Sequence, residues 1–277
     1  MVSQEQRRRQ LAREKFLRQQ QRRTSARRRN QTRNAVIAAV VGVVVAGGAT
    51  AYATGLFKSD DKKANAGAGA TPSPTPSAAP TSKAPDPCEK PAAGQVKSLT
   101  WKKEPALAID KSAAYTMKMA TTCGDIDIAL KASAAPHTVN SFDFLAGKGY
   151  FDHTKCHRLT TNGIYVLQCG DPTAQGSGGP GYTIPDENLK DASLKNNVYP
   201  AGTIAMANTG QKHTGGSQFF LVYQDSQLPP SYTPFGTISK SGLTVLKKIA
   251  AAGESTGQGD GAPNATVVIN KLTVTKS

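Results

Sequence analysis

Residues 156–159 read Cys-His-Arg-Leu, and residues 168–171 read Gln-Cys-Gly-Asp. A second pair follows, with Met-Ala-Asn at 206–208 and Ser-Gln-Phe-Phe-Leu at 217–221. Together these segments supply one cation, the side-chain amides of glutamine and asparagine, and several apolar or aromatic side chains. They contain no evident nucleophile or metal-ligand cluster. Such an inventory suits a site that binds a peptide and stabilises a twisted amide without breaking a covalent bond.

The sequence around these segments has the pattern of a small β-rich domain. Apolar residues alternate around a Thr-Thr-Cys-Gly-Asp turn, which indicates a β-hairpin. The predicted strands lie at 115–119, 126–130, 164–168, 202–207, 218–222 and 266–275, and the predicted helices at 136–145 and 243–252. This content, within residues 113–277, predicts a mainly β fold: a closed barrel capped by two α-helices.

The N-terminal residues 1–34 carry eleven Arg and one Lys against Glu5 and Glu14, so they hold +10 of the chain's net charge of +15. A block of like charge is typical of a solvated, poorly folded tail. Clustered arginine can neutralise nucleic-acid phosphates. The tail precedes an apolar segment, however, and Phe16 is its only aromatic residue. Anionic membrane lipids are therefore the expected partner, and no nucleic acid is expected.

Residues 35–57 form an uncharged stretch of 23 residues, longer than the roughly 20 that span a bilayer as a helix. Arginine before it and Asp60 and Asp61 after it predict a cytoplasmic N-terminus and an extracytoplasmic C-terminus. A cleaved signal peptide with Ala-Tyr-Ala at 51–53 is the alternative, although signal peptides have shorter charged and apolar regions. We expect a single-pass membrane anchor, and both interpretations export the rest of the chain.

Residues 58–112 are rich in Pro, Ala and Gly, which predicts an extended extracytoplasmic linker before a domain at 113–277. Trp101, the only tryptophan, is expected to dock on that domain. The cysteines are Cys88, Cys123, Cys156 and Cys169, and four cysteines allow three disulfide connectivities. Because Cys156 and Cys169 flank a predicted hairpin, the hypothesis is a 156–169 bridge, which leaves Cys88 to reach Cys123.

The motifs at 156–171 and 206–221, with Phe-Gly at 235–236, resemble those of the cyclophilin family of peptidyl-prolyl cis–trans isomerases. The likeness covers about residues 115–276, and the anchor, linker and exported domain look like the membrane-tethered cyclophilins of some bacteria. It implies a closed eight-stranded antiparallel barrel with a helix at each end and a substrate groove on the outer face. It also implies isomerisation of X-Pro bonds in exported proteins, and binding of proline-containing polypeptides.

The resemblance assigns roles residue by residue. It implies catalytic roles for Arg158, Gln168 and Asn208, and substrate contacts for Tyr165, Val166, Ala207, Gln218, Phe220, Leu228 and Tyr232. Counted back from Gln168, Tyr165 and Val166 fall where the family usually has Phe and Met, and the chain is two residues longer than the family pattern between Arg158 and Gln168. Tyr232 stands where many members have a histidine, and Gln227 where eukaryotic members often have a tryptophan. Weak cyclosporin binding is expected.

The chemistry can be argued from the residues themselves. Rotation about a prolyl bond has a barrier of about 18–20 kcal/mol because of amide resonance. A guanidinium that donates a hydrogen bond to the prolyl nitrogen as it pyramidalises weakens that resonance, and Arg158 is the candidate donor. No cofactor or metal is expected. The alternative is a non-catalytic module that binds proline peptides or acts as a chaperone on the same barrel.

Three neighbouring features have simpler structural interpretations. His157 precedes Arg158 and is expected to point the other way, as a buried and hydrogen-bonded structural residue. Asp171 follows a glycine at the end of a strand, so a turn role is expected. The glycine-rich residues 176–181 lack the Lys-Ser/Thr of a phosphate loop, and a mobile loop beside the groove is expected instead.

Overall fold

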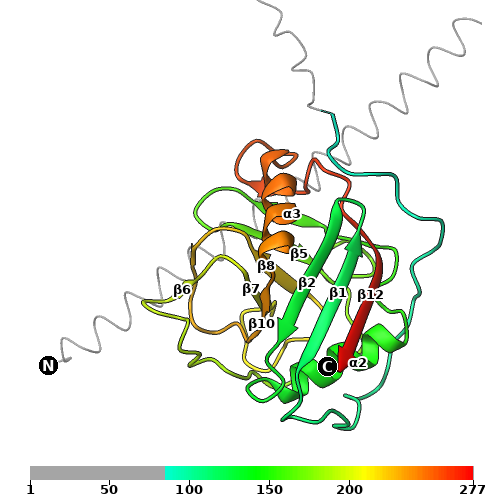
Figure 1. Ribbon diagram of the computed structural model, residues 1–277, viewed down its shortest axis with the longest axis vertical. Helices are drawn as coiled ribbons and strands as arrows, with labels where there is room; N and C mark the ends of the chain where they lie inside the picture. Colours follow the sequence, from blue (N-terminus) through cyan, green and yellow to red (C-terminus); the bar gives the residue numbers. More distant parts are fainter. Residues whose placement is uncertain (1–84, 277) are drawn as a thin grey trace, which may run out of the picture. The chain divides into compact units, whose positions relative to one another are not determined.

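The hairpin that the apolar alternation predicts forms two of the three longest strands of the sheet. In a computed structural model, which describes residues 85–276, β1 (Tyr115–Thr121) pairs with β2 (Gly124–Leu130) and with β12 (Val268–Lys276). Every second residue of β1 is buried. Thr121 closes the turn, because its hydroxyl donates a 2.6 Å hydrogen bond to the carbonyl of Gly124. These three strands lie side by side in Figure 1.

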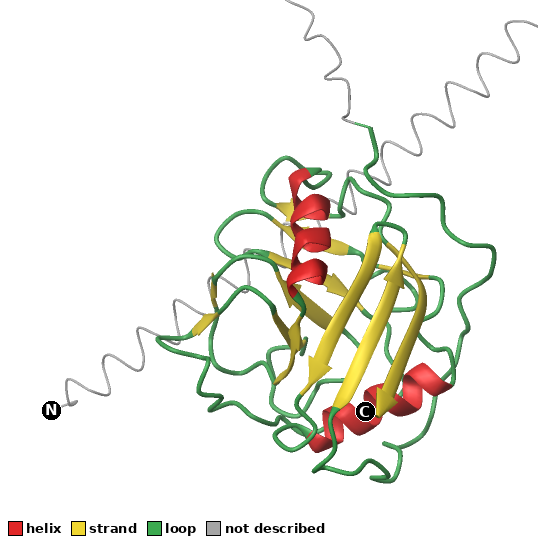
Figure 2. Cartoon of the chain, viewed as in Figure 1, coloured by secondary structure: helices red, strands yellow, loops and turns green. Residues whose placement is uncertain are grey.

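The remaining strands are short. They are β3 (Thr154–Lys155), β4 (Arg158–Thr160), β5 (Val166–Cys169), β6 (Val198–Tyr199), β7 (Thr203–Met206), β8 (Phe219–Val222), β9 (Ser226–Gln227), β10 (Pro234–Ile238) and β11 (Asp260–Gly261). Ten strands form one sheet in the order β11-β4-β5-β8-β7-β10-β2-β1-β12-β3, and β6 pairs with β9 in a separate ribbon. Figure 2 shows the sheet curving around the molecule's interior.

The described part of the chain is mainly β with two helices, as predicted, but the closed eight-stranded barrel is wrong. Within residues 85–276 the ladder has ten strands and is open between β11 and β3, which makes it a half-barrel. The sheet stays open because Cys156 and His157, which are adjacent in the chain, form backbone hydrogen bonds with different segments. The amide of Cys156 donates to Val267 on one side, and the amide of His157 donates to Gln168 on the other. The chain therefore contributes β3 to one end of the sheet and β4 next to β11 at the other end.

Both helices begin where side chains satisfy their first amides. Helix α3 (Lys240–Ala251) is capped by Ser239, whose hydroxyl accepts a hydrogen bond from the amide of Gly242. Helix α2 (Pro136–Gly147) begins with proline and has no side-chain cap of its own. The carboxylate of Glu187 replaces that cap by accepting from the amides of His137 and Thr138. Helix α2 packs against β12 and α3 against β2 (Figure 1).

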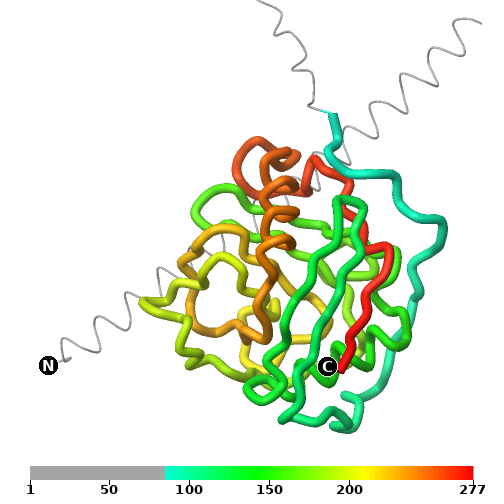
Figure 3. Tube along the Cα trace, viewed as in Figure 1, coloured from blue at the N-terminus to red at the C-terminus, as the bar shows by residue number. Residues whose placement is uncertain are grey.

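Residues 85–112 contain no helix or strand, yet they are attached to the sheet and to α2 at several points. Cys88 forms a disulfide with Cys123 at the β1–β2 turn. The ring of Trp101 packs edge-on against Phe144 of α2 with a centroid distance of 5.1 Å, so the expected docking of the tryptophan is confirmed. Figure 3 shows this segment in cyan, running along the outside of the domain.

The interior of the half-barrel is aromatic. Phe142 of α2 contacts Phe151, Phe219 and Phe235 at centroid distances of 4.6–5.5 Å, and all four side chains are fully buried. A second, smaller group of buried apolar residues forms a separate cluster, which we call the outer cluster. Its members are Val166, Tyr199, Ala205, Phe220 and Val222.

The basic tail at 1–34, the predicted transmembrane helix at 35–57 and the first part of the predicted linker lie outside the described residues. In residues 85–276, no helix combines the length and the apolar character that crossing a bilayer requires.

Candidate active site

Strand register brings the motif residues onto one face of the sheet. Arg158 on β4 pairs with Gln168 on β5, Gln168 pairs with Phe220 on β8, and Phe220 pairs with Ala205 on β7. Residues directly opposite one another in an antiparallel sheet share a face. The adjacent row, Leu159, Leu167, Leu221 and Ile204, therefore faces the interior, where all four side chains are buried. The outward row carries the chemistry.

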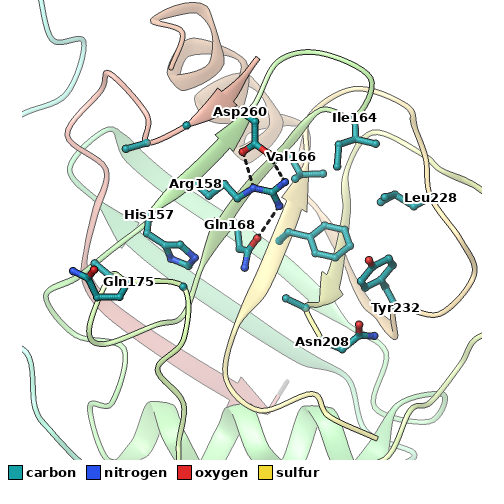
Figure 4. A pocket seen from close by; sticks show the side chains of 16 residues that line it. His157, Arg158, Ile164, Val166, Gln168, Gln175, Asn208, Leu228, Tyr232 and Asp260 are labelled. Atoms are coloured by element: carbon teal, nitrogen blue, oxygen red, sulfur yellow. Dashed lines mark hydrogen bonds and ion pairs between the residues drawn. The ribbon is translucent and has the colours of Figure 1, made fainter. Parts of the chain in front are cut away.

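A cavity of about 560 Å³ opens over this outward row. Most of the predicted site residues line it: Arg158, Val166, Gln168, Ala207, Asn208, Phe220, Leu228 and Tyr232. It is also lined by residues for which no substrate role was predicted, among them His157, Ile164, Gln175 and Asp260. Figure 4 shows the guanidinium of Arg158 on one side of the cavity and Leu228 and Tyr232 on the other.

The Arg158 guanidinium is held by two partners. Its Nε and Nη2 donate to the two carboxylate oxygens of Asp260 at 2.7 and 2.8 Å, and its Nη1 donates to Oε1 of Gln168 at 3.2 Å (Figure 4). The hydrogen bond to Asp260 raises the pKa of the guanidinium, although partial burial opposes this effect. The site therefore contains a permanently charged donor in a fixed orientation.

Side-chain amides extend this contact into a chain. Nε2 of Gln168 donates to Oε1 of Gln218 at 2.9 Å, and Nε2 of Gln218 donates to the carbonyl of Gly178 at 2.9 Å. Gln218 lies in a second hollow of about 660 Å³, which shares Gln168, Ala207 and Asn208 with the first. The two hollows form one continuous groove, and residues 176–181 lie along the second, as expected of a loop beside the groove.

The floor of the cavity is apolar. The Phe220 side chain is 5% exposed and meets the Tyr232 ring edge-on at a centroid distance of 5.4 Å. Val166 and Leu228 complete the apolar lining, together with Ile164. A flat aromatic surface with aliphatic walls suits a pyrrolidine ring, which is apolar and has no N–H donor.

Asn208 lines the groove, but its side chain is engaged with its own loop. Nδ2 donates to the carbonyl of Ser231 at 2.8 Å, and Oδ1 accepts from the amide of Gly210 at 2.9 Å. The side chain thus holds the segment after β7 in place, and Ala207 and Asn208 both line the cavity.

The structure does not bring Tyr165 into the cavity. Its ring packs against Tyr223 at a centroid distance of 5.9 Å, beside a different hollow. Side chains alternate along an extended strand, so Tyr165 and Val166 cannot both face the groove. Ile164 takes the place that Tyr165 was given. Counting back from Gln168 in steps of two reaches Val166 and then Ile164, and this simple count identifies the missed residue.

His157 is only partly as expected. Its ring is half-buried at the edge of the cavity, and neither ring nitrogen has a hydrogen-bond partner among the described residues. The predicted hydrogen-bonded role is therefore wrong. Burial lowers the pKa of the imidazole, which keeps the ring neutral close to the Arg158 charge.

Asp171 has the predicted turn role. Its buried carboxylate accepts hydrogen bonds from the amides of Thr173, Ser177 and Gly178 at 2.7–3.1 Å. Burial alone would raise the pKa of this carboxyl group, but the donors at Gly178 and Thr173 outweigh it, and the pKa is lowered. Asp171 thereby shapes the loop that lines both hollows.

The end of β5 is constrained by a close backbone contact at Gly170 and by a disulfide at Cys169. Gly170 has a φ of 88°, and a Cβ at this position would collide with the carbonyl of Ser217. Cys156 is bonded to Cys169, so both bridges of the sequence hypothesis are confirmed. This second bridge lies next to Arg158 and Gln168 along the chain.

A family model described as cyclophilin type peptidyl-prolyl cis-trans isomerase/CLD matches residues 116–274, more than half of the chain. The chain belongs to the cyclophilin family. Similar proteins include the probable peptidyl-prolyl cis-trans isomerase B of Mycobacterium leprae, 47% identical over 198 residues that make up 69% of this chain and 63% of that protein. The chain thus spans less than two thirds of that relative's length.

Other cyclophilins are similar to this chain over the same domain. The peptidyl-prolyl cis-trans isomerase B of Bacillus subtilis is 39% identical over 126 residues, which are 45% of this chain and 82% of that protein. A crystal structure of a cyclophilin type isomerase from Cryptosporidium parvum superposes with a TM-score of 0.50 at 26% identity, covering 59% of this chain and 99% of that one. These matches cover the half-barrel and its groove.

Proposed function

We propose that this cyclophilin domain catalyses cis–trans isomerisation of X-Pro bonds by stabilising the twisted amide. The observation that carries the proposal is the outward row of the sheet. It places the Arg158 guanidinium at the rim of a cavity whose floor is Phe220. One side chain can then grip the prolyl ring while the other reaches the bond that rotates.

The guanidinium has donors to spare. An arginine carries five N–H groups. Within residues 85–276, Asp260 and Gln168 engage three of them, so two remain for the substrate. As the prolyl bond twists, its nitrogen loses conjugation and becomes a hydrogen-bond acceptor. A donor fixed at this point favours the twisted state over both planar states, which is the requirement for catalysis.

The remaining groove residues bind the substrate on either side of the proline. The main chain at Ala207 and Asn208 and the amides of Gln168 and Gln218 offer polar contacts to the peptide backbone. Phe220 and the walls formed by Val166, Leu228 and Tyr232 surround the ring. No step needs a cofactor, because no covalent bond is made or broken.

A proline-limited refolding assay on the full-length protein and on Arg158→Ala tests the proposal. We expect catalytic amounts of the wild-type protein to accelerate refolding, and the variant to lose about 100-fold in kcat/KM. Equal acceleration by both proteins would reject the catalytic role of Arg158. Absence of acceleration by either, with proline peptides still bound, would identify a binding or chaperone module.

We further propose that the protein is membrane-anchored by residues 35–57, with residues 1–34 in the cytoplasm and the domain outside. The apolar stretch, its flanking charges and the two disulfides support this, since disulfides persist in oxidising compartments. Protease added to intact, right-side-out vesicles should digest the domain and spare the tail. Protection of the domain would reject this orientation.

The tail is proposed to bind anionic lipid. A peptide of residues 1–34 should sediment with vesicles that contain phosphatidylglycerol and remain in solution with neutral vesicles, an effect that salt weakens. Weak cyclosporin binding is proposed on the basis of Gln227 and Tyr232. A Gln227→Trp variant should bind the drug more tightly, and an unchanged affinity would remove Gln227 from the explanation.

A further inference from the structure

The partner of Arg158 that the sequence did not indicate is Asp260. It lies 102 residues further along the chain and binds the guanidinium in a bidentate manner, at 2.7 and 2.8 Å. We propose that Asp260 is a positioning residue for the isomerase reaction, which fixes the guanidinium plane so that its two free N–H groups face the prolyl bond. This inference rests on the proposed function.

The geometry of the ion pair supports a role in orientation. The Asp260 carboxylate accepts hydrogen bonds from Nε and Nη2, and Oε1 of Gln168 accepts one from Nη1 on another edge of the guanidinium. Two partners on different edges of a planar group prevent it from rotating or swinging out of the cavity. Figure 4 shows Asp260 and Gln168 on different sides of the guanidinium, with Val166 beside it.

The solvent exposure of this ion pair argues against a role mainly in stabilising the fold. The side chains of Arg158 and Asp260 are 38% and 56% exposed. Ion pairs this exposed contribute typically under about 1 kcal/mol to folding, because water screens the attraction and two long side chains lose entropy. A free arginine side chain has several rotatable bonds, so holding it before the substrate arrives lowers the entropic barrier of the reaction. The effect of Asp260 should therefore appear in turnover.

The loop that carries Asp260 is built to hold it. Glu254 is buried, and its carboxylate accepts hydrogen bonds from the amides of Thr256 and Gly259 at 2.6 and 2.8 Å. Gly259 has a φ of 92°, and its carbonyl accepts from the amide of Thr161. Asp260 then pairs with Thr160 in the β11–β4 ladder. The carboxylate is thus attached to the same strand as the arginine that it orients.

The test is a double-mutant cycle on the full-length protein with Asp260→Ala, Arg158→Ala and the combined variant. Proline isomerisation of a short peptide is followed to give kcat and KM. We expect Asp260→Ala to lower kcat about tenfold with KM changed less than about twofold, because orientation is lost and groove contacts remain. In the Arg158→Ala background the same change should have no further effect.

Two further variants sharpen the cycle. Asp260→Asn keeps one oxygen acceptor, so its kcat should lie between those of the wild type and Asp260→Ala. Asp125→Ala removes a similarly exposed carboxylate (51% against 56%) that pairs with Lys118 on the β1–β2 hairpin, and it should leave kcat unchanged. Melting temperatures of all variants show whether any loss in kcat arises from unfolding.

The outcomes separate the two proposals. If Arg158→Ala is as active as the wild type, the proposed function is rejected. If Arg158→Ala loses activity but Asp260→Ala keeps its kcat, only the positioning role is rejected. An equal loss from Asp260→Ala in both backgrounds would also overturn it, because the residue would then not act through Arg158.

Discussion

The two halves of the curved sheet differ in what covers their outer face. On β1 and β2, buried and accessible residues alternate, so one face packs inward and the other meets solvent. On β7 and β8, every residue is buried. Their outer face carries Ala205 and Phe220, which pack in the outer cluster. The groove is thus a second apolar surface added outside a complete core, and it is available to a ligand.

The two adjacent phenylalanines on β8 give the strongest test of the difference between the interior core and the outer groove surface. Phe219 packs in the interior against Phe142, and Phe220 faces the cavity beside Tyr232. Phe219→Ala should reduce the free energy of unfolding by about 4 kcal/mol, while the folded protein keeps its kcat/KM. Phe220→Ala should cost about 2 kcal/mol in stability but lower kcat/KM about 100-fold.

Urea unfolding and peptide isomerisation measured on the same samples check both values. Loss of activity by the folded Phe219→Ala protein, with full activity in Phe220→Ala, would reverse the assignment of the two faces.

The two disulfides allow a second comparison, because each belongs to one half. Cys88–Cys123 closes 35 residues and Cys156–Cys169 closes 13. From loop entropy, replacing each pair with alanine should cost about 4 and about 3 kcal/mol, respectively. For activity we expect the reverse order, with the larger effect from removing the Cys156–Cys169 bridge. Loss of the 156–169 bridge loosens the Arg158–Gln168 register and should lower kcat about tenfold, whereas loss of the other should leave kcat within about twofold.

Thermal unfolding and kcat of the two double-alanine variants provide the measurement. Equal effects of both replacements on kcat would mean that the bridge near the groove has no special role.

The smallest effect concerns Asp171 and the loop that it holds, which lines both hollows. Asp171→Asn removes a buried carboxylate with several amide donors and should cost about 2 kcal/mol at pH 7. Because the folded pKa of Asp171 is lowered below 3.8, this stabilisation is complete above pH 3.8 and is lost as the pH falls through the folded pKa. The difference between the wild type and the variant should therefore shrink in strong acid.

Unfolding free energies across the acid range, with Asp125→Asn as an exposed control, check the sign. A difference that grows as the pH falls would contradict it.

Sequence reasoning found most of the groove because its residues lie in local motifs. Arg158, Gln168 and Phe220 fall on neighbouring strands, and register alone aligns them. Tyr165 occupies a family groove position, but the chain is two residues longer between Arg158 and Gln168, and strand alternation turns the Tyr165 side chain away from the cavity. Asp260 lies in a glycine-rich loop far along the chain, where no apolar period or motif marks it.

The fold shows the same limits. The hairpin and both helices follow from apolar spacing, but the opening of the sheet does not, because it depends on the change of hydrogen-bond partner between Cys156 and His157. The composition of residues 58–112 predicts a linker. The attachment of residues 85–112 depends instead on single residues, such as Cys88 and Trp101, whose partners lie elsewhere in the chain.

The central claim is that the charged rim and the aromatic floor of one groove act together on a prolyl bond. NMR exchange spectroscopy on an Ala-Pro peptide, with catalytic amounts of the full-length protein, measures the interconversion of its cis and trans forms directly. We predict exchange cross-peaks with the wild-type protein that Arg158→Ala and Phe220→Ala each reduce about 100-fold. Undiminished exchange with both variants would contradict the account.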